Sequence, residues 1–245
     1  MVDRILSELH QERIVAIAQQ IIAIPSVTNA EHAMSDYTAQ FLHNLGFSVT
    51  RLAVAESGDT IVATYGSGDQ AVMLNFHLDT FDVFVGWESD PFIPVISGDR
   101  MYGLGAHDMK GGAACVLAIA EALVTSGVQL PGRVIISATS DEENWSRGAH
   151  VMLASNLLHG CVAALVPEPS NAGTLTIGQR GRHVFHVQFW EKPCMPPLAV
   201  ASMLQQMRRD LLRPSKNLVQ LIWDGATNLD SLGHVMSSVS RVAVL

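Results

Sequence analysis

The stretch "VMLNFHLDTFDV", residues 72–83, joins an apolar run to a group of ionisable side chains. The apolar part reaches Phe76, and His77, Asp79 and Asp82 then follow within six residues. A short apolar run bounded by polar residues predicts a buried β-strand. Ligands of open α/β sheets bind at the carboxyl ends of the strands, so the residues after Phe76 are candidates for a functional site.

The sequence on both sides of this stretch predicts strands that alternate with helices. Residues 108–127 have the 3.6-residue apolar period of a helix, which we expect to begin at Asp108. Asn29 is the expected cap of an earlier helix, and Gly46 its stop. The alternation predicts the α/β class, with a mostly parallel sheet flanked by helices. The expected helices are residues 3–23, 29–46, 108–127 and 147–158, the expected strands are residues 47–54, 60–66, 71–76, 133–140 and 162–167, and residues 91–103 are an expected edge hairpin.

The pattern changes after "GQRGR", residues 178–182. An alternating strand, a helix and two more strands follow, in β-α-β-β order. We therefore expect a main domain over residues 1–179 and a small second domain over residues 180–245.

Composition excludes several classes of function. The 245 residues carry a formal net charge of −8, which argues against a nucleic-acid surface. The sequence contains no run of about eighteen uninterrupted apolar residues, so we expect no membrane-spanning helix. The start of the chain also lacks the pattern of a signal peptide. Cys115, Cys161 and Cys194 are few, odd in number and widely spaced, which indicates free thiols in a reducing compartment. We expect a cytoplasmic protein without a membrane or nucleic-acid partner.

Ionisable side chains also follow the other predicted strands. Asp108 opens a predicted helix, Glu142 and Glu143 follow the strand at 133–140, and Glu168 follows the strand at 162–167. Each has a simpler explanation when taken alone: Asp108 as a helix cap, the glutamate pair as capping residues and Glu168 as a loop charge. Together with His77, however, they would bring one imidazole and several carboxylates to one edge of the sheet.

Such a set of side chains is typical of a metal site. Zinc binds histidine nitrogen and carboxylate oxygen, and a cation relieves the repulsion between crowded carboxylates. A carboxylate at Asp79 can hold the ring N–H of His77 and orient that ligand. One member of the Glu142–Glu143 pair can bind metal, and the other can take a proton from a water molecule.

Five motifs carry a resemblance to a known family. "HLDTFDV", "GLGAHDMKGG", "SDEENWSRGA", "VPEPS" and "GQRGR" occur in this order over roughly residues 70–182. The sequence resembles the zinc-dependent amidohydrolases that include acetylornithine deacetylase, succinyl-diaminopimelate desuccinylase, aminoacylases and glutamate carboxypeptidase. The resemblance implies a zinc-binding α/β domain with an inserted lid that often dimerises. The β-α-β-β segment over residues 180–245 would be a partial lid, and we expect a homo-oligomer.

The resemblance also implies a role for each candidate residue. His77 matches the imidazole ligand of one metal, and Glu168 matches a carboxylate ligand of that same metal. Asp108 matches the carboxylate that bridges two metals, and Glu143 a ligand of the second. Glu142 matches the general base that activates water. Asp79 matches the carboxylate that positions His77.

Two features depart from the family pattern. The family has a substrate-binding histidine after the first lid strand, and "FWEKPCMPPLAVASML" (residues 189–204) contains none. The family chain also returns to the catalytic domain and supplies a late histidine ligand. This sequence ends at Leu245, and His234 does not resemble that motif. We therefore expect the C-terminal part of the catalytic domain to be lacking.

The metal count follows from these departures. His77, Asp108 and Glu168 supply three protein ligands, the pattern of an open catalytic zinc. The second site keeps Asp108 and Glu143, with His107, His150 or a partner chain as possible sources of the missing ligand. We expect one well-held zinc and a weak second metal, with cobalt or manganese as alternatives.

The sequence leaves more than one function open. The first hypothesis is a metal-dependent hydrolase that cleaves an amide bond in an N-acyl amino acid or a small peptide. The alternative is a truncated or degenerate relative that binds metal but is catalytically impaired. A serine or cysteine hydrolase, a third possibility, would keep its activity in the presence of a chelator, whereas the first would lose it.

Overall fold

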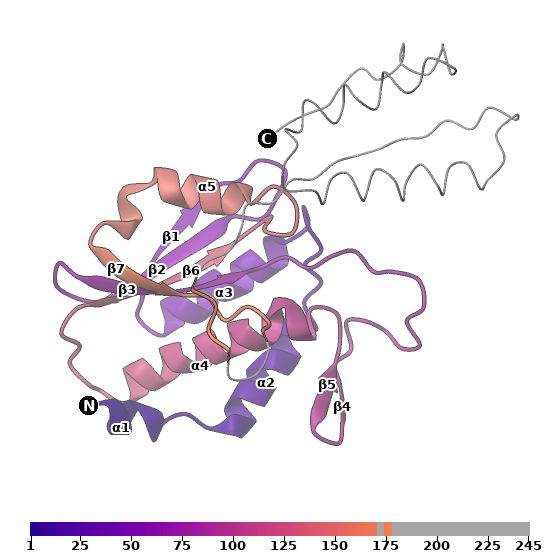
Figure 1. The fold of residues 1–245 in the computed structure, drawn as a ribbon, viewed down its shortest axis with the longest axis horizontal. Helices are drawn as coiled ribbons and strands as arrows, with labels where there is room; N and C mark the ends of the chain where they lie inside the picture. Colours follow the sequence, from indigo (N-terminus) through magenta and orange to yellow (C-terminus); the bar gives the residue numbers. More distant parts are fainter. Residues whose placement is uncertain (171–173, 178–245) are drawn as a thin grey trace, which may run out of the picture. The chain divides into compact units, whose positions relative to one another are not determined.

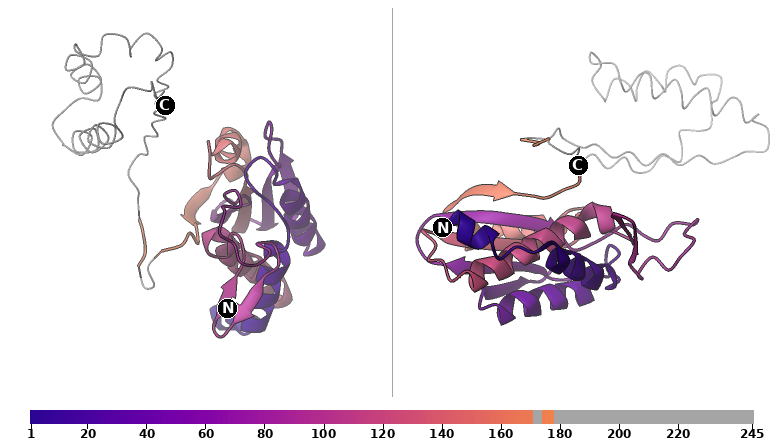
Figure 2. Two further views of the ribbon diagram at one scale, coloured as in Figure 1. Left: turned by 90° about the vertical axis from the view of Figure 1, so that its right-hand side faces the viewer. Right: turned by 90° about the horizontal axis from the view of Figure 1, so that it is seen from below.

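The computed structural model of this chain describes residues 1–170 and 174–177. A five-stranded sheet lies at its centre, with helices on both faces (Figures 1 and 2). The strands follow one another across the sheet in the order β1-β2-β6-β3-β7. They are β1 (Ser48–Leu52), β2 (Thr60–Gly66), β3 (Ala71–His77), β6 (Arg133–Thr139) and β7 (Cys161–Leu165).

The sheet is mixed, and its parallel part carries the candidate residues. β2 pairs antiparallel with both β1 and β6, whereas β3 pairs parallel with both β6 and β7. The expected α/β class is confirmed, with the antiparallel pairs confined to the β1 side. In the parallel part His77 lies opposite Thr139, and Leu74 lies opposite Leu165. The carboxyl ends of β3, β6 and β7 therefore meet at one edge of the sheet.

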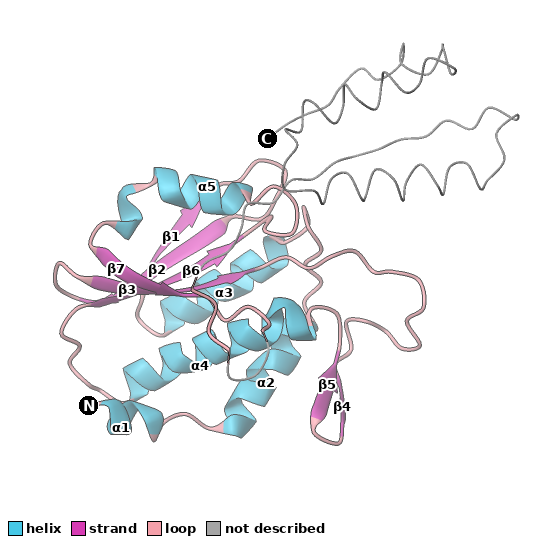
Figure 3. Ribbon diagram, in the orientation of Figure 1, coloured by secondary structure: helices cyan, strands magenta, loops and turns pink. Residues whose placement is uncertain are grey.

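Among the described residues, three helices cover one face of the sheet, and one covers the other. The elements outside the sheet are α1 (Val2–Leu6), α2 (Gln11–Ile22), α3 (His32–Asn44), the hairpin β4 (Val95–Ser97) and β5 (Arg100–Tyr102), the irregular segment η1 (Ala106–Lys110), α4 (Gly111–Thr125), α5 (Arg147–Ala154) and the short turn η2 (Asn156–Leu158). Of these, α2, α3 and α4 pack together with β1, β2 and β3 on the first face, and α5 contacts β1, β2 and β6 (Figure 3).

The two faces of the sheet divide the core into two apolar clusters. Ile61 and Ala63 of β2 belong to the cluster under α2, α3 and α4, and Val62 belongs to the cluster with Met152 of α5. This division follows from the two-residue period of a strand, which sends successive side chains to opposite faces. Complete burial of a side chain such as Ile61 contributes about 1.5–3 kcal/mol. The sheet is therefore anchored on both sides beneath the candidate site.

Two expected helices begin or end at different residues. The single helix predicted over residues 3–23 is two helices, because the Ser7 hydroxyl bonds the Arg4 carbonyl and His10 is extended. The helix predicted to open at Asp108 begins at Gly111, because Asp108 has φ −123° and ψ 104°, which are not helical values. Asp108 is therefore not a helix cap.

Asn29 is not a helix cap either. It has φ +71°, and its side chain accepts a hydrogen bond from Arg147, while α3 begins only at His32. The expected stop at Gly46 is confirmed: its φ is +88°, and its amide bonds the His43 carbonyl. A left-handed φ of this kind favours glycine, which has no Cβ.

The strand predicted over residues 162–167 differs in its burial. The apolar run predicts a buried strand, yet most of β7 is exposed because it lies at the edge of the sheet. The hairpin predicted over residues 91–103 forms as β4 and β5, but it is a separate two-stranded sheet and not an edge of the five-stranded sheet. In the described part of the chain, no helix is both long and apolar enough to cross a membrane. The expected lid over residues 180–245 lies outside the described residues.

Candidate metal centre

His77, the last residue of β3, is the most buried of the predicted metal ligands. It is 2% exposed. Its Nδ1 lies 2.9 Å from the main-chain carbonyl oxygen of Asp79. A carbonyl oxygen can only accept a hydrogen bond, so Nδ1 must carry the proton. Nε2 faces the carboxylates, 3.1 Å from Asp108 Oδ1 and 3.7 Å from Glu168 Oε1. Nε2 is therefore the nitrogen placed to bind a cation.

The buried Asp79 carboxylate holds the loop after β6. Oδ1 accepts the Glu142 amide at 3.0 Å, and Oδ2 accepts the Glu143 amide at 3.1 Å and the Thr28 hydroxyl at 3.0 Å. Burial raises the pKa of the Asp79 carboxyl, and these donors oppose the rise. The sequence predicted that this carboxylate holds the His77 ring. In the structure Oδ1 is 3.6 Å from Nδ1, and the Asp79 carbonyl makes the shorter contact.

Asp108 reaches the site from the irregular segment before α4. Its side chain is about half exposed and points to His77 Nε2. Behind it Lys110 is 1% exposed, and its Nζ donates a 2.7 Å hydrogen bond to the Ile24 carbonyl. Burial lowers the pKa of Lys110 to about 7. The lysine thus ties the segment that carries Asp108 to the end of α2.

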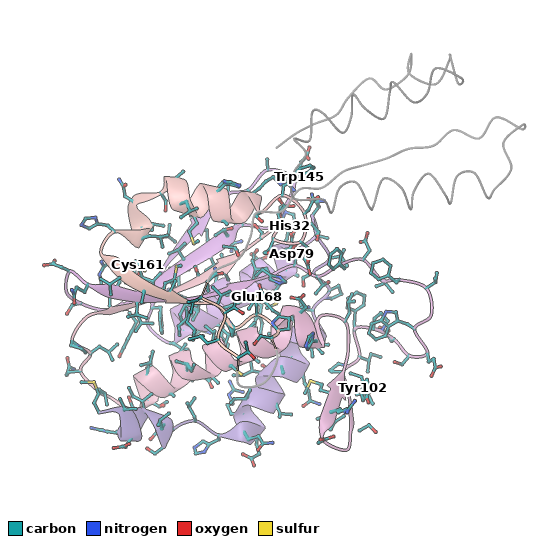
Figure 4. All side chains as sticks on the ribbon, in the orientation of Figure 1. His32, Asp79, Tyr102, Trp145, Cys161 and Glu168 are labelled. Carbon is teal, nitrogen blue, oxygen red and sulfur yellow. The ribbon has the colours of Figure 1, made fainter. Side chains whose placement is uncertain are left out.

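Glu168 follows β7, and the residue before it, Pro167, lies against the start of α4. A Cβ on Gly112 would come within 2.3 Å of the Pro167 carbonyl oxygen, so only glycine allows this approach. Gly112 thus lets the segment that carries Glu168 pass close to the first turn of α4. Figure 4 labels Asp79 and Glu168, which come from the loops that follow β3 and β7.

Mutual repulsion and burial perturb the carboxylates of this cluster. Burial, and then the neighbouring Asp108, raise the pKa of Glu143 to about 7. Burial raises the pKa of Glu168 to about 7 as well, and the charges of Asp108 and Glu142 add to the rise. For His77 burial opposes protonation, but the surrounding carboxylates raise its pKa overall. A divalent cation would remove this repulsion, so the donor set fits a metal.

The structure brings the predicted ligands together in a particular way. Ligand atoms of His77, Asp108 and Glu143 all lie within 4.8 Å of one another. Glu168 also faces His77, at the 3.7 Å distance given above. Within the described residues, neither His107 nor His150 joins this group. His234 lies outside the described residues.

Several residues that support the site were not predicted from the sequence. Thr28 bonds Asp79 from a loop far away in the chain. Asp141, directly before Glu142, is completely buried and bonds Arg147. Arg147 and Asp141 lie inside the "SDEENWSRGA" motif, so their six-residue spacing was a usable signal. The contact of Thr28 has no such local signal.

Comparisons with known proteins agree with this geometry. The sequence model of peptidase family M20/M25/M40 matches residues 73–228. Succinyl-diaminopimelate desuccinylase of Rhizorhabdus wittichii is 37% identical over 131 residues, which are 52% of this chain and 34% of that protein. N-formyl-4-amino-5-aminomethyl-2-methylpyrimidine deformylase of Bacillus subtilis is 32% identical over 146 residues, 56% of this chain and 34% of that protein.

The fold has solved counterparts too. The crystal structure of human carnosine dipeptidase 1 matches with a TM-score of 0.59 and 22% identity. The match covers 67% of this chain and 40% of the dipeptidase chain. This chain therefore spans about a third of the length of the two curated relatives named above.

Proposed function

This chain belongs to peptidase family M20/M25/M40, and we propose that it is a metal-dependent hydrolase that cleaves an amide bond in an N-acyl amino acid or a small peptide. The observation that carries the proposal is the meeting of one imidazole nitrogen with several carboxylates at the carboxyl edge of the parallel strands. The names of the relatives describe desuccinylation and deformylation, reactions that release an acyl group from nitrogen.

The chain's own residues can be assigned to the metal. His77 Nε2, Asp108 and Glu168 would hold one zinc firmly, and Asp108 and Glu143 would hold a second metal weakly. Cobalt or manganese could replace zinc at either position. When bound, such a cation supplies Lewis-acid polarisation of the scissile carbonyl and lowers the pKa of a water molecule.

The remaining roles belong to protein groups. Glu142 takes a proton from the attacking water at its carboxylate and passes it to the leaving amine nitrogen. The hydrogen bond from the Glu142 amide to the Asp79 carboxylate fixes the position of the Glu142 main chain. The Asp79 carbonyl fixes the tautomer and the orientation of the His77 ring. The substrate class is an N-acyl amino acid or peptide, and the identity of the acyl group is left open.

Hydrolysis of a panel of N-acyl amino acids and dipeptides tests this function. The purified 245-residue chain is assayed with zinc, with chelator, and as Glu142→Ala. Glu88→Ala serves as the matched control, because Glu88 is an exposed glutamate of the loop after β3. We expect zinc-dependent turnover that Glu142→Ala abolishes and Glu88→Ala retains. Turnover that persists in chelator would contradict the proposal.

A second candidate function is metal binding with impaired catalysis. It is favoured by the ligand set of the described residues, in which neither His107 nor His150 joins the group of His77, Asp108 and Glu143. A folded chain that binds zinc but hydrolyses no member of the panel would support this candidate over the first.

The proposal includes a cytoplasmic homo-oligomer. The small, odd number of cysteines favours a reducing compartment. Apolar side chains on the edge strand and just after it are exposed in the described part of the chain, among them Val162, Leu165 and Val166. Exposed apolar surface of this kind favours association. Light scattering tests the oligomer, and a monodisperse monomer would contradict it.

A further inference from the structure

Backbone strain in this chain is concentrated around one arginine. Among the described residues, four that are not glycine have a positive φ: Asn29 (71°), Glu56 (59°), Asp141 (61°) and Ser146 (53°). Side chains with a Cβ adopt this region reluctantly, and such residues persist only where the surrounding structure holds them. All four lie next to Arg147, although they come from three separate loops.

The Arg147 guanidinium bonds each of these loops. Nε and Nη2 donate to the two carboxylate oxygens of Asp141, at 2.7 and 3.0 Å. Nη2 also donates to the Asn29 side chain, and Nη1 donates to the Ala55 carbonyl at 2.7 Å. The Glu56 carboxylate lies 3.9 Å from Nη1. One planar group with five donors thus joins the loops before α3, between β1 and β2, and after β6.

The partner of this guanidinium is completely buried and fixed from both sides. The Asp141 carboxylate also accepts the Arg147 amide at 3.1 Å, and the Asp141 carbonyl accepts the Ser146 amide at 2.6 Å. The Asp141 amide donates at 3.1 Å to Glu31, a buried carboxylate that also accepts from Ser57 and Gly58. The backbone of Asp141 therefore has little freedom to rotate.

The loop leaves Asp141 directly toward the metal centre. The next two amides, of Glu142 and Glu143, both point to the Asp79 carboxylate. Successive amides that follow a left-handed residue commonly form a hollow of this kind around an anion. The conformation of Asp141 thus determines where the main chain of both glutamates lies.

We propose that Arg147 is a positioning residue for the metal centre, which through Asp141 holds Glu142 and Glu143 in the orientation that metal binding and proton transfer require. The inference rests on the proposed function for its catalytic meaning. Its structural part, the hold of Arg147 on the two glutamate amides, is independent of that function.

Hydrogen exchange tests the structural part. Arg147→Ala should accelerate exchange of the Glu142 and Glu143 amides, measured by mass spectrometry on peptides that cover residues 141–146. Arg51 supplies the matched control, because its guanidinium also bonds two carboxylates, Asp36 and Asp59, but away from the site. Arg51→Ala should leave these two amides unchanged. Unchanged exchange in folded Arg147→Ala would overturn the inference, even if the wild-type chain neither binds zinc nor turns over substrate.

Zinc affinity and chemical rescue test the functional part. Competition with a chromophoric chelator should show about tenfold weaker zinc binding in Arg147→Ala. Loss of a residue that orients the metal ligands commonly has an effect of this size. Millimolar guanidinium should restore part of this loss in Arg147→Ala and nothing in Arg51→Ala. In an active chain kcat should fall while KM changes little. Wild-type zinc affinity in folded Arg147→Ala would overturn this part.

Arg147→Lys keeps the test open if Arg147→Ala does not fold. Lysine retains the charge but cannot bond both Asp141 oxygens as a planar fork. We expect intermediate exchange rates and intermediate zinc affinity. Wild-type values for both in Arg147→Lys would show that charge alone suffices, and they would overturn the positioning role.

Discussion

Asp79 Oδ1 accepts the main-chain amide of Glu142 at 3.0 Å, although the two residues are 63 positions apart in the sequence. This bond connects the loop after β3 to the loop after β6 at the edge where both strands end. The carbonyl of the same aspartate orients the His77 ring. One buried residue therefore sets the position of an imidazole and of the glutamate loop together.

Asp79→Asn should damage the metal centre more than it damages the fold. The NH2 group of the asparagine would face one of the two glutamate amides. Both groups are hydrogen-bond donors, so one of the two bonds would be lost. We expect zinc affinity to fall about tenfold to a hundredfold and the free energy of unfolding to fall by about 1–3 kcal/mol. Chelator competition and urea unfolding measure the two effects. Asp82→Asn, at an exposed position in the same loop, is the control and should match the wild-type chain.

Glu168→Gln and Glu143→Gln should affect zinc binding unequally. If Glu168 shares the firmly held metal with His77, its replacement should weaken that site about tenfold or more. Glu143→Gln should instead reduce only the weaker second binding event. Zinc titrations of both variants measure this. If zinc affinity falls more in Glu143→Gln than in Glu168→Gln, the firmly held metal is bound by His77, Asp108 and Glu143 instead.

The metal-free chain should become less stable as the pH rises toward neutrality. Glu168 keeps its proton until a pH of about 7 in the folded chain, but it loses that proton near its ordinary pKa of 4.5 when unfolded. Between these values the folded chain binds more protons, so its free energy of unfolding falls as the pH rises.

Glu168→Gln should reduce this slope, because glutamine does not titrate. Urea midpoints across this pH range, in the presence of chelator, provide the measurement. Glu88→Gln, at an exposed position, should keep the wild-type slope. Identical slopes in all three proteins would mean that Glu168 is not perturbed in the folded chain.

Gly112→Ala should displace Glu168 without unfolding α4. Alanine favours a helix by up to about 1 kcal/mol over glycine, but its Cβ would meet the Pro167 carbonyl at 2.3 Å. We therefore expect circular dichroism to show an intact helix while zinc affinity falls. Cys115→Ala, at an exposed position of the same helix, should change neither. Unchanged zinc affinity in Gly112→Ala would show that the close contact between α4 and Pro167 does not determine the position of Glu168.

The sequence was informative about the site because the ionisable residues follow strands that the apolar pattern marks clearly. Parallel strands end at a common edge, so the convergence of His77, Glu143 and Glu168 could be predicted from the order of strands and polar residues alone. The backbone conformation of Asp108 could not be predicted, since a helix cap and an irregular segment before a helix share the same local sequence. The exposure of β7 was missed because an apolar run does not distinguish an edge strand from a central one.

The supporting contacts were beyond sequence analysis for a different reason. Arg147 bonds Asn29 across 118 positions, and Thr28 bonds Asp79 across 51. Local patterns and periodicity report on neighbours within a few residues, whereas these bonds depend on how loops meet after the sheet has formed. Asn29 illustrates the difference, because its short polar side chain suggested a cap and instead accepts from a distant guanidinium.

The loop that Arg147 holds also contains Trp145, a residue that is 55% exposed and that Figure 4 labels. Tryptophan fluorescence responds to solvent and to neighbouring charges, so this indole is a natural optical reporter placed two residues from Glu143. Replacement of Trp87, Trp190 and Trp223 by phenylalanine would leave it as the single emitter. The filling of the metal centre could then be followed in real time without any attached dye.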